Sequence, residues 1–150
     1  MLSHTHIGIT DFPRALAFYS TLMAELGHVL KFSDADRGWA GWMPVDTARP
    51  LFLIGRPYDG AAASPGNGQM VALLAASRET VRRCHAVALA AGGTDEGAPG
   101  LRPHYHSDYY GAYFRDPDAI SSASAAIITR KRISTERPST VQTAVKNVAG

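Results

Sequence analysis

Two short segments of the sequence carry histidines at alternate positions. His4 and His6 form one pair, and His104, His106 and Asp108 form the second group. Imidazole and carboxylate groups bind divalent transition metals, and a neutral imidazole also exchanges hydrogen bonds with a bound ligand. Two side chains two residues apart on a strand can chelate one ion only if the strand is distorted, which argues against a metal at the first pair. The second group lies in a segment rich in proline and tyrosine, where a hydrogen-bonding role is commoner. The simpler interpretation of both groups is polar contact with a ligand or with the protein itself.

Aromatic and apolar side chains are candidates for the wall of a pocket beside these histidines. They are Trp39, Trp42, Phe52, Met70, Tyr109, Tyr110 and Tyr113. Because side chains alternate along a strand, Tyr110 and Tyr113 lie on opposite faces. Arg56 and Arg102, each followed by proline, are either anion contacts at the rim or exposed charges. Aromatic walls with a few polar groups are typical of a site that orients a planar or carbonyl-bearing ligand.

A repeat with an offset of 66 residues indicates how these groups are positioned. The segment 4–11 and the amphipathic run that ends at Gly27 have counterparts in 70–77 and in the run that ends at Gly93. Each copy combines a short apolar strand, a capped helix and a terminal glycine. Two similar halves must pack together, so we expect a cleft between them and a functional site in that cleft.

The first copy predicts a βαβββ unit. A strand is expected over 4–10, followed by Asp11 as the helix N-cap and Pro13 in the first turn. The helix continues to Gly27 with an apolar face at the helical period. Three further strands are expected at 28–32, 39–43 and 51–54.

The second copy predicts the same unit with a less regular end. A strand over 69–76, Ser77 as the cap and a helix to Gly93 are expected, with His85 half-exposed on that helix. The glycines and prolines of 97–103 should interrupt regular secondary structure. A strand over 109–114 and a closing strand within 120–129 are expected after them. We expect a first module over 1–57, a linker over 58–68, a second module over 69–129 and a basic tail over 130–150.

Composition restricts the class of protein. The chain has 150 residues, of which 45% are hydrophobic and 19% charged, with a net charge of +2. It has no apolar run of the roughly 20 residues that cross a membrane, so we expect no membrane partner. Its single cysteine, Cys84, excludes an internal disulfide and favours the cytoplasm. The tail holds five basic residues and one acidic residue without aromatics. We therefore expect a solvated terminus, and no nucleic-acid partner.

The repeat and several short motifs resemble the vicinal oxygen chelate superfamily, which includes glyoxalase I, bleomycin-resistance proteins and extradiol dioxygenases. These motifs are the His4…Asp11 spacing, Asn67-Gly68, and Phe-Arg-Asp116-Pro-Asp118. The segments 54–57, 64–68 and 100–106 are similar to its bacterial glyoxalase-like branch. The resemblance covers about residues 3–118. It implies an α+β fold in which two βαβββ modules form a curved mixed sheet around a central cavity, with helices outside, and usually a homodimer.

The same resemblance places metal ligands on the first and last strands of the modules. The first ligand position falls on His4, its counterpart on Met70 and the expected closing glutamate on Ala123. A divalent site combines three or more protein ligands, and a thioether does not replace imidazole for such an ion. We therefore expect no cofactor; the alternative is Zn, Ni, Mn or Fe held by His4 and other ligands.

Three functions are consistent with this pattern. One is a metal-free binder of a small organic molecule, like the bleomycin-resistance group, and the missing ligands favour it. The second is a metal-dependent glyoxalase-like lyase or dioxygenase that acts on a substrate with vicinal oxygens. The third is an inactive structural dimer. The side chains expected to contact a ligand are His4, His6, Trp42, Arg56, Met70, His104, His106 and Tyr110.

Overall fold

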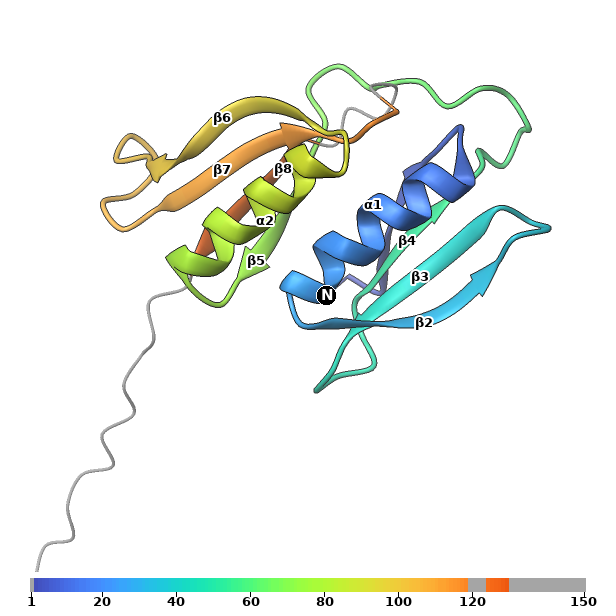
Figure 1. Cartoon of the computed structure of the whole chain (residues 1–150), viewed down its shortest axis with the longest axis horizontal. Helices are drawn as coiled ribbons and strands as arrows, with labels where there is room; N and C mark the ends of the chain where they lie inside the picture. Colours follow the sequence, from blue (N-terminus) through green and yellow to red (C-terminus); the bar gives the residue numbers. More distant parts are fainter. Residues whose placement is uncertain (1, 119–123, 130–150) are drawn as a thin grey trace, which may run out of the picture.

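A computed structural model describes residues 2–118 and, for the backbone alone, 124–129. The expected tail 130–150, Ala123 and the start of the closing strand lie outside the described residues. The chain folds as an α+β protein of two consecutive units (Figure 1). The first unit contains β1 (His4–Gly8), α1 (Phe12–Glu25), β2 (His28–Asp34), β3 (Trp39–Pro44) and β4 (Leu51–Gly55). The second contains β5 (Met70–Ala75), α2 (Arg78–Ala90), β6 (Thr94–Leu101), β7 (Tyr110–Arg115) and β8 (Ser124–Thr129).

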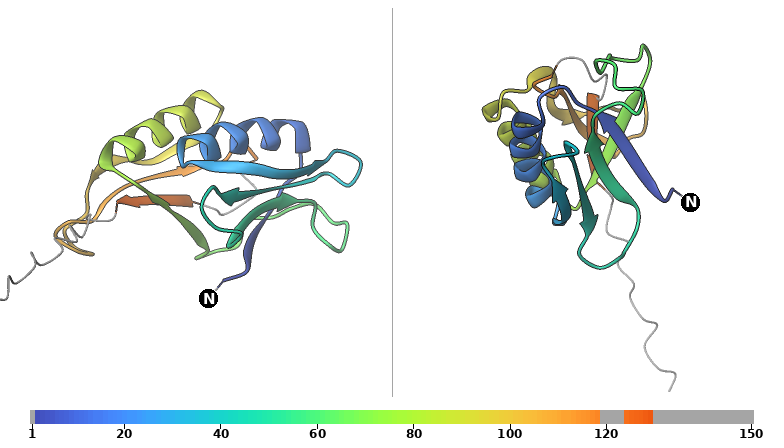
Figure 2. Two further views of the ribbon diagram at one scale, coloured as in Figure 1. Left: turned by 90° about the horizontal axis from the view of Figure 1, so that it is seen from below. Right: turned by 90° about the vertical axis from the view of Figure 1, so that its right-hand side faces the viewer.

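The strand pairings repeat between the two units. The first sheet has the order β1-β4-β3-β2, with β1 parallel to β4 and the other neighbours antiparallel. In the second unit β5 pairs in parallel with β8, β6 pairs with β7, and β7 lies beside β8. His4 is opposite Leu51, and Met70 is opposite Ser124. The equivalent registers confirm the repeat, and both helices cover the same side of the curved strands (Figure 2).

The start of each helix is determined by its own residues. The Asp11 carboxylate accepts a hydrogen bond from the Arg14 backbone N–H at 3.0 Å, and proline occupies the first turn of α1. The Ser77 hydroxyl accepts from the Thr80 N–H at 3.0 Å and caps α2 in the same way. Both predicted N-caps are confirmed.

The two helices end differently, so the constant offset is wrong at this point. In the first unit Gly27 has a φ of 74°, whereas in the second Gly92 adopts the positive φ, at 95°. α2 therefore ends one residue before the position expected from Gly93. Gly93 is restricted by space instead, since a Cβ there would lie 2.7 Å from the Arg115 carbonyl oxygen and 2.8 Å from that of Ala88.

Two further expectations for the second unit are wrong. His85 is buried rather than half-exposed, because its Nε2 lies 3.0 Å from Asp95 Oδ1 and its ring packs against Phe114. The glycines and the proline from Gly97 to Gly100 do not interrupt the strand. They lie inside β6, where register shifts against β7 absorb the extra residues as bulges.

A shared core joins the units. Aromatic residues of α1 contact both sheets: Phe18 lies 6.2 Å from Phe114, and Tyr19 lies 5.1 Å from Phe52, measured between ring centroids. α1 and α2 also lie side by side (Figure 1). The Tyr19 hydroxyl donates to Asp116 at 3.0 Å, which adds a buried polar link between the units. The two units consequently share one hydrophobic core.

Candidate functional site

A polar hollow lies between the units, where β1 approaches the start of β5. It has a volume of about 330 Å³. The first unit contributes His6 and Gly8, β5 contributes Met70 and Val71, and the linker covers one side. Its full lining is His6, Ile7, Gly8, Pro57, Asp59, Ala62, Ala63, Ser64, Gln69, Met70 and Val71.

An apolar hollow of about 380 Å³ lies further along the same boundary. The edge of β5 forms one wall, and residues from β1 to β4 form the other. Its lining is Leu2, Thr5, Leu26, His28, Pro44, Pro50, Leu51, Phe52, Val71, Ala72, Leu73 and Leu74. Val71 lines both hollows, so they adjoin at this residue, and the two together are called the inter-module cleft below.

His6 is the imidazole that lines the polar half of the cleft. Its ring lies over Gly55, because a Cβ at that glycine would be 2.9 Å from His6 Nε2 and 3.1 Å from the Cβ of Trp39. Partial burial, and secondarily a positive charge on His4, lower the pKa of His6 below its ordinary value of 6.5. His6 is therefore neutral at neutral pH and can either donate or accept a hydrogen bond.

His28 is the imidazole of the apolar half. Its Nδ1 lies 3.3 Å from the Leu26 carbonyl oxygen, which requires Nδ1 to carry the proton that it donates. In the neutral ring Nε2 is then an acceptor. Thr5 adds one hydroxyl to the same lining. The apolar half thus offers few polar side chains, at defined places.

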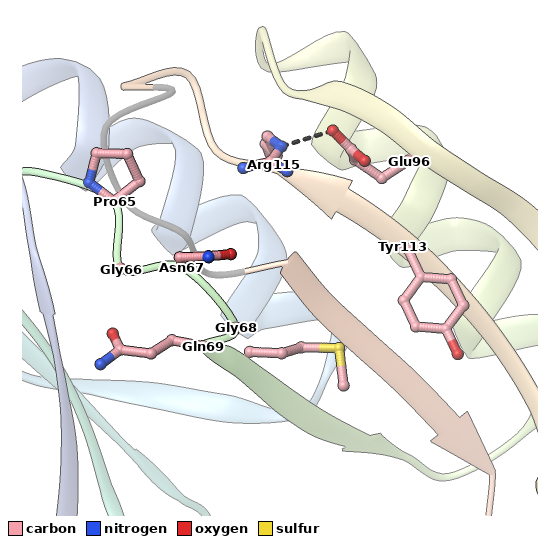
Figure 3. Close-up of a pocket in the computed structure, with 9 residues that line it drawn as sticks. Pro65, Gly66, Asn67, Gly68, Gln69, Glu96, Tyr113 and Arg115 are labelled. Carbon is pink, nitrogen blue, oxygen red and sulfur yellow. Dashed lines mark hydrogen bonds and ion pairs between the residues drawn. The ribbon is translucent and has the colours of Figure 1, made fainter.

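A third hollow, of about 520 Å³, lies between the linker and the strands β6 and β7 (Figure 3). Glu96 and Arg115 face each other across the two strands, with Arg115 Nε 2.5 Å from Glu96 Oε1. Asn67 and Gln69 enter from the linker side, and Tyr113 lies further along β7. Gln69 lines this hollow as well as the polar half of the cleft. The linker therefore contributes to two hollows.

Of the eight side chains expected to contact a ligand, the cleft brings together His6 and Met70. His4 is exposed on the same face of β1, with its Nδ1 2.8 Å from the Ser3 hydroxyl. Trp42 is 1% exposed and packs with Tyr19 and Phe52 under α1, on the side of the sheet opposite His6. Its position is that of a core residue.

The remaining four expected residues lie away from the cleft. Arg56 is exposed against Gly38, and Tyr110 faces α2, where its hydroxyl accepts from Arg82 at 3.1 Å. His104 and His106 lie in the exposed segment between β6 and β7. The His106 Nδ1 accepts from the Asp108 backbone N–H at 3.1 Å, which is a local turn contact.

Sequence reasoning did not identify His28, Thr5 or the part of β5 beyond Met70 as parts of the site. The available signal was the uninterrupted apolar run from Met70 to Ala75. It contains Leu74, which is 49% exposed. An exposed apolar strand edge beside a second edge is a feature of a cleft rather than of a closed sheet.

The metal-ligand positions were tested against the described residues. Within 2–118, no three histidine, cysteine, aspartate or glutamate side chains converge as a metal site would require. His4 is opposite Leu51 on β4, and its counterpart Met70 supplies a thioether. Together they offer one imidazole and one thioether, and the third expected position, Ala123, lies outside the described residues. Neither described helix is long and apolar enough to cross a membrane.

Comparison with solved structures identifies similar folds. The chain is 30% identical to a glyoxalase/bleomycin resistance protein from Albidiferax ferrireducens, with a TM-score of 0.75 over 87% of this chain and 99% of that one. It is 16% identical to a glyoxalase-related enzyme from Fulvimarina pelagi, with a TM-score of 0.65 over 87% and 88% of the two chains. A glyoxalase/bleomycin resistance protein/dioxygenase family enzyme from Burkholderia phytofirmans is 20% identical, with a TM-score of 0.58 over 85% and 94%. Protein-family models gave no match, and neither did a search of curated proteins.

Proposed function

Because the chain belongs to the glyoxalase/bleomycin resistance protein/dioxygenase superfamily, we propose that it binds a small organic molecule between its two modules, without the usual metal. The observation that supports this most directly is the inter-module cleft, to which both modules and the linker contribute. Its two halves, of about 330 and 380 Å³, each fall in the size range of small-molecule sites. His6 provides a hydrogen-bonding group at one end.

The donor set supports binding without a metal. Met70 stands where a second imidazole would be needed, and leucines of β4 lie opposite the histidines of β1. A metal-dependent lyase or dioxygenase is the second candidate, because His4 and His6 share one face of β1. Metal analysis of the purified protein separates the two candidates. Stoichiometric Zn, Ni, Mn or Fe that is lost in His4→Ala would contradict metal-free binding.

Ligand binding itself is tested by filling the cleft. A thermal-shift screen with small organic molecules should find stabilising compounds for the unmodified protein. Val71→Phe, at the junction of the two halves, should abolish their effect by occupying the space. Val45→Phe, at a residue 65% exposed on the loop after β3, is the matched control and should leave it unchanged. Equal ligand responses in both variants would contradict the proposal.

We also propose that the protein is a cytoplasmic homodimer. β2 is an edge strand of the first sheet and exposes Val29 and Leu30, at 42% and 50%. An edge with exposed apolar residues is suited to association with a second copy. The only cysteine, Cys84, is buried and unpaired, which is compatible with a reducing compartment. Sedimentation of the unmodified protein at micromolar concentration should give twice the monomer mass, and Leu30→Lys should lower that mass. A monomeric unmodified protein would contradict the proposed dimer.

A further inference from the structure

We infer that the ligand of the cleft is amphipathic, with an alkyl or alicyclic body in the apolar half and one uncharged hydrogen-bonding head in the polar half. This inference rests on the proposed function and specifies its ligand class. It follows from the different chemistry of the two halves, from their contact at Val71 and from the charge of the polar half.

The apolar half selects the body of the ligand. Proline, leucine, valine and phenylalanine side chains form most of its wall, and Thr5 and His28 are its polar side chains. His28 already donates from Nδ1 to the Leu26 carbonyl. A ligand group that carries polar atoms would lose its hydrogen bonds with water here and regain few of them from the side chains of this half. Hydrocarbon is therefore the chemistry that this half accepts.

The polar half selects the head. Backbone hydrogen bonds at both ends of β1 join it to β4. The Leu51 N–H donates to the Ser3 carbonyl oxygen, and the Ile9 N–H donates to the Gly55 carbonyl oxygen. In a parallel edge strand, successive residues direct their backbone N–H and C=O groups to opposite sides. Because Ser3 and Ile9 face β4, the backbone groups of His6 and Gly8 face away from β4 and toward the cleft. The head thus meets backbone donors and acceptors together with the His6 ring.

Charge excludes an anionic head. The lining of the polar half contains one acidic side chain, Asp59, and no lysine or arginine. His6 is neutral there because burial lowers its pKa, so it does not compensate a ligand carboxylate. A hydroxyl or a carboxamide can donate and accept without this penalty. Arg56, the nearest arginine in sequence, lies against Gly38 and outside the lining.

The test is a calorimetric titration of the full-length protein with linear primary alcohols from butanol to decanol, each below its solubility limit. Affinity should rise about fourfold for each added methylene and stop rising when the apolar half is full. The carboxylate of equal chain length should bind about tenfold more weakly near pH 7. Leu74→Gln, which places an amide in the apolar half, should flatten the dependence on chain length.

The control for Leu74→Gln is Leu101→Gln. Leu74 and Leu101 are each 49% exposed, but Leu101 lies on β6 and outside the lining of the cleft. The control should bind like the unmodified protein, and the chain-length series on unmodified protein does not depend on either variant. An affinity independent of chain length, or equal losses in both variants, would overturn the amphipathic class.

Compact polar probes such as glycerol and glucose separate failure of the ligand class from failure of the proposed function. If they bind, Val71→Phe blocks them and the alcohols do not bind, the ligand class is wrong and the proposed cleft stands. If neither the probes, the alcohols nor the wider screen gives binding that Val71→Phe removes, both proposals fail. Alcohol binding that Val71→Phe leaves intact places the ligand elsewhere and also overturns both.

Discussion

The buried hydrogen bond between Tyr19 and Asp116 connects the two modules, and removing it should destabilise the whole protein. Tyr19 belongs to α1 of the first module, and Asp116 follows β7 of the second. Both residues are 3% exposed, and the hydroxyl donates to Oδ2 at 3.0 Å. Tyr19→Phe deletes this hydroxyl and keeps the ring that contacts Phe18 and Phe52.

The magnitude follows from burial and from the type of acceptor. Removing one partner of a buried hydrogen bond costs about 1–3 kcal/mol, because the remaining acceptor is not resolvated at that site. The ring contacts are unchanged, so no cavity contribution is added. We therefore expect Tyr19→Phe to lower the free energy of unfolding by about 2 kcal/mol. For a chain of this size, that corresponds to a decrease in Tm of about 4–8 °C.

Urea unfolding monitored by tryptophan fluorescence measures this change, because Trp42 is buried beside Tyr19. Tyr58→Phe is the control, since Tyr58 is fully exposed and its hydroxyl deletion should not change the midpoint. In a double-mutant cycle with Asp116→Asn, the two losses should be less than additive. An unchanged free energy of unfolding for Tyr19→Phe, or strict additivity, would refute the proposed link.

Three further predictions concern single groups. Burial raises the pKa of the Cys84 thiol to about 12, so iodoacetamide at about pH 8 should modify it only after unfolding in urea, as mass spectrometry would show. The pKa of His6 is lower in the folded chain than its ordinary 6.5. The unfolded state therefore binds the proton first as the pH falls through 6.5, and stability decreases. His6→Gln should weaken this decrease in thermal unfolding measured from about pH 7.5 to 5. Gly92→Ala should destabilise by about 1–2 kcal/mol through its positive φ, and Gly93→Ala by more, because its Cβ meets two backbone oxygens; equal losses would contradict this.

The features that sequence predicted correctly depend on local chemistry. Asp11 and Ser77 cap their helices through contacts three residues away, which the sequence contains entirely. The first strand and the helix of each unit also lie where the repeat predicts them. The path of β6 could not be predicted this way. Glycine and proline weaken a strand in isolation, and only pairing with β7 shows that Gly97 and Gly100 stay in register while the residues before each of them are accommodated as bulges.

The candidate site was less predictable, because alternation along a strand does not reveal which face is the buried one. In β3, Trp39 and Trp42 are equally apolar, and contact of Trp42 with α1 decides that it belongs to the core. In β7 the opposite faces of Tyr110 and Tyr113 follow from their spacing. Only the position of α2 shows that Tyr110 faces the helix and interacts with Arg82.

The chemical division of the cleft originates in two unlike edge strands. β1 places His4 and His6 on one face, while its equivalent β5 is the apolar run from Met70 to Ala75. A repeat with histidine in both copies would make the two sides of the cleft similar and would favour a shared ion. At the positions that correspond to His4 and His6, the second copy has Met70 and Ala72, which offer no imidazole and present apolar surface instead. The proposed metal-free binding and the proposed amphipathic ligand would thus both follow from this one difference between the copies.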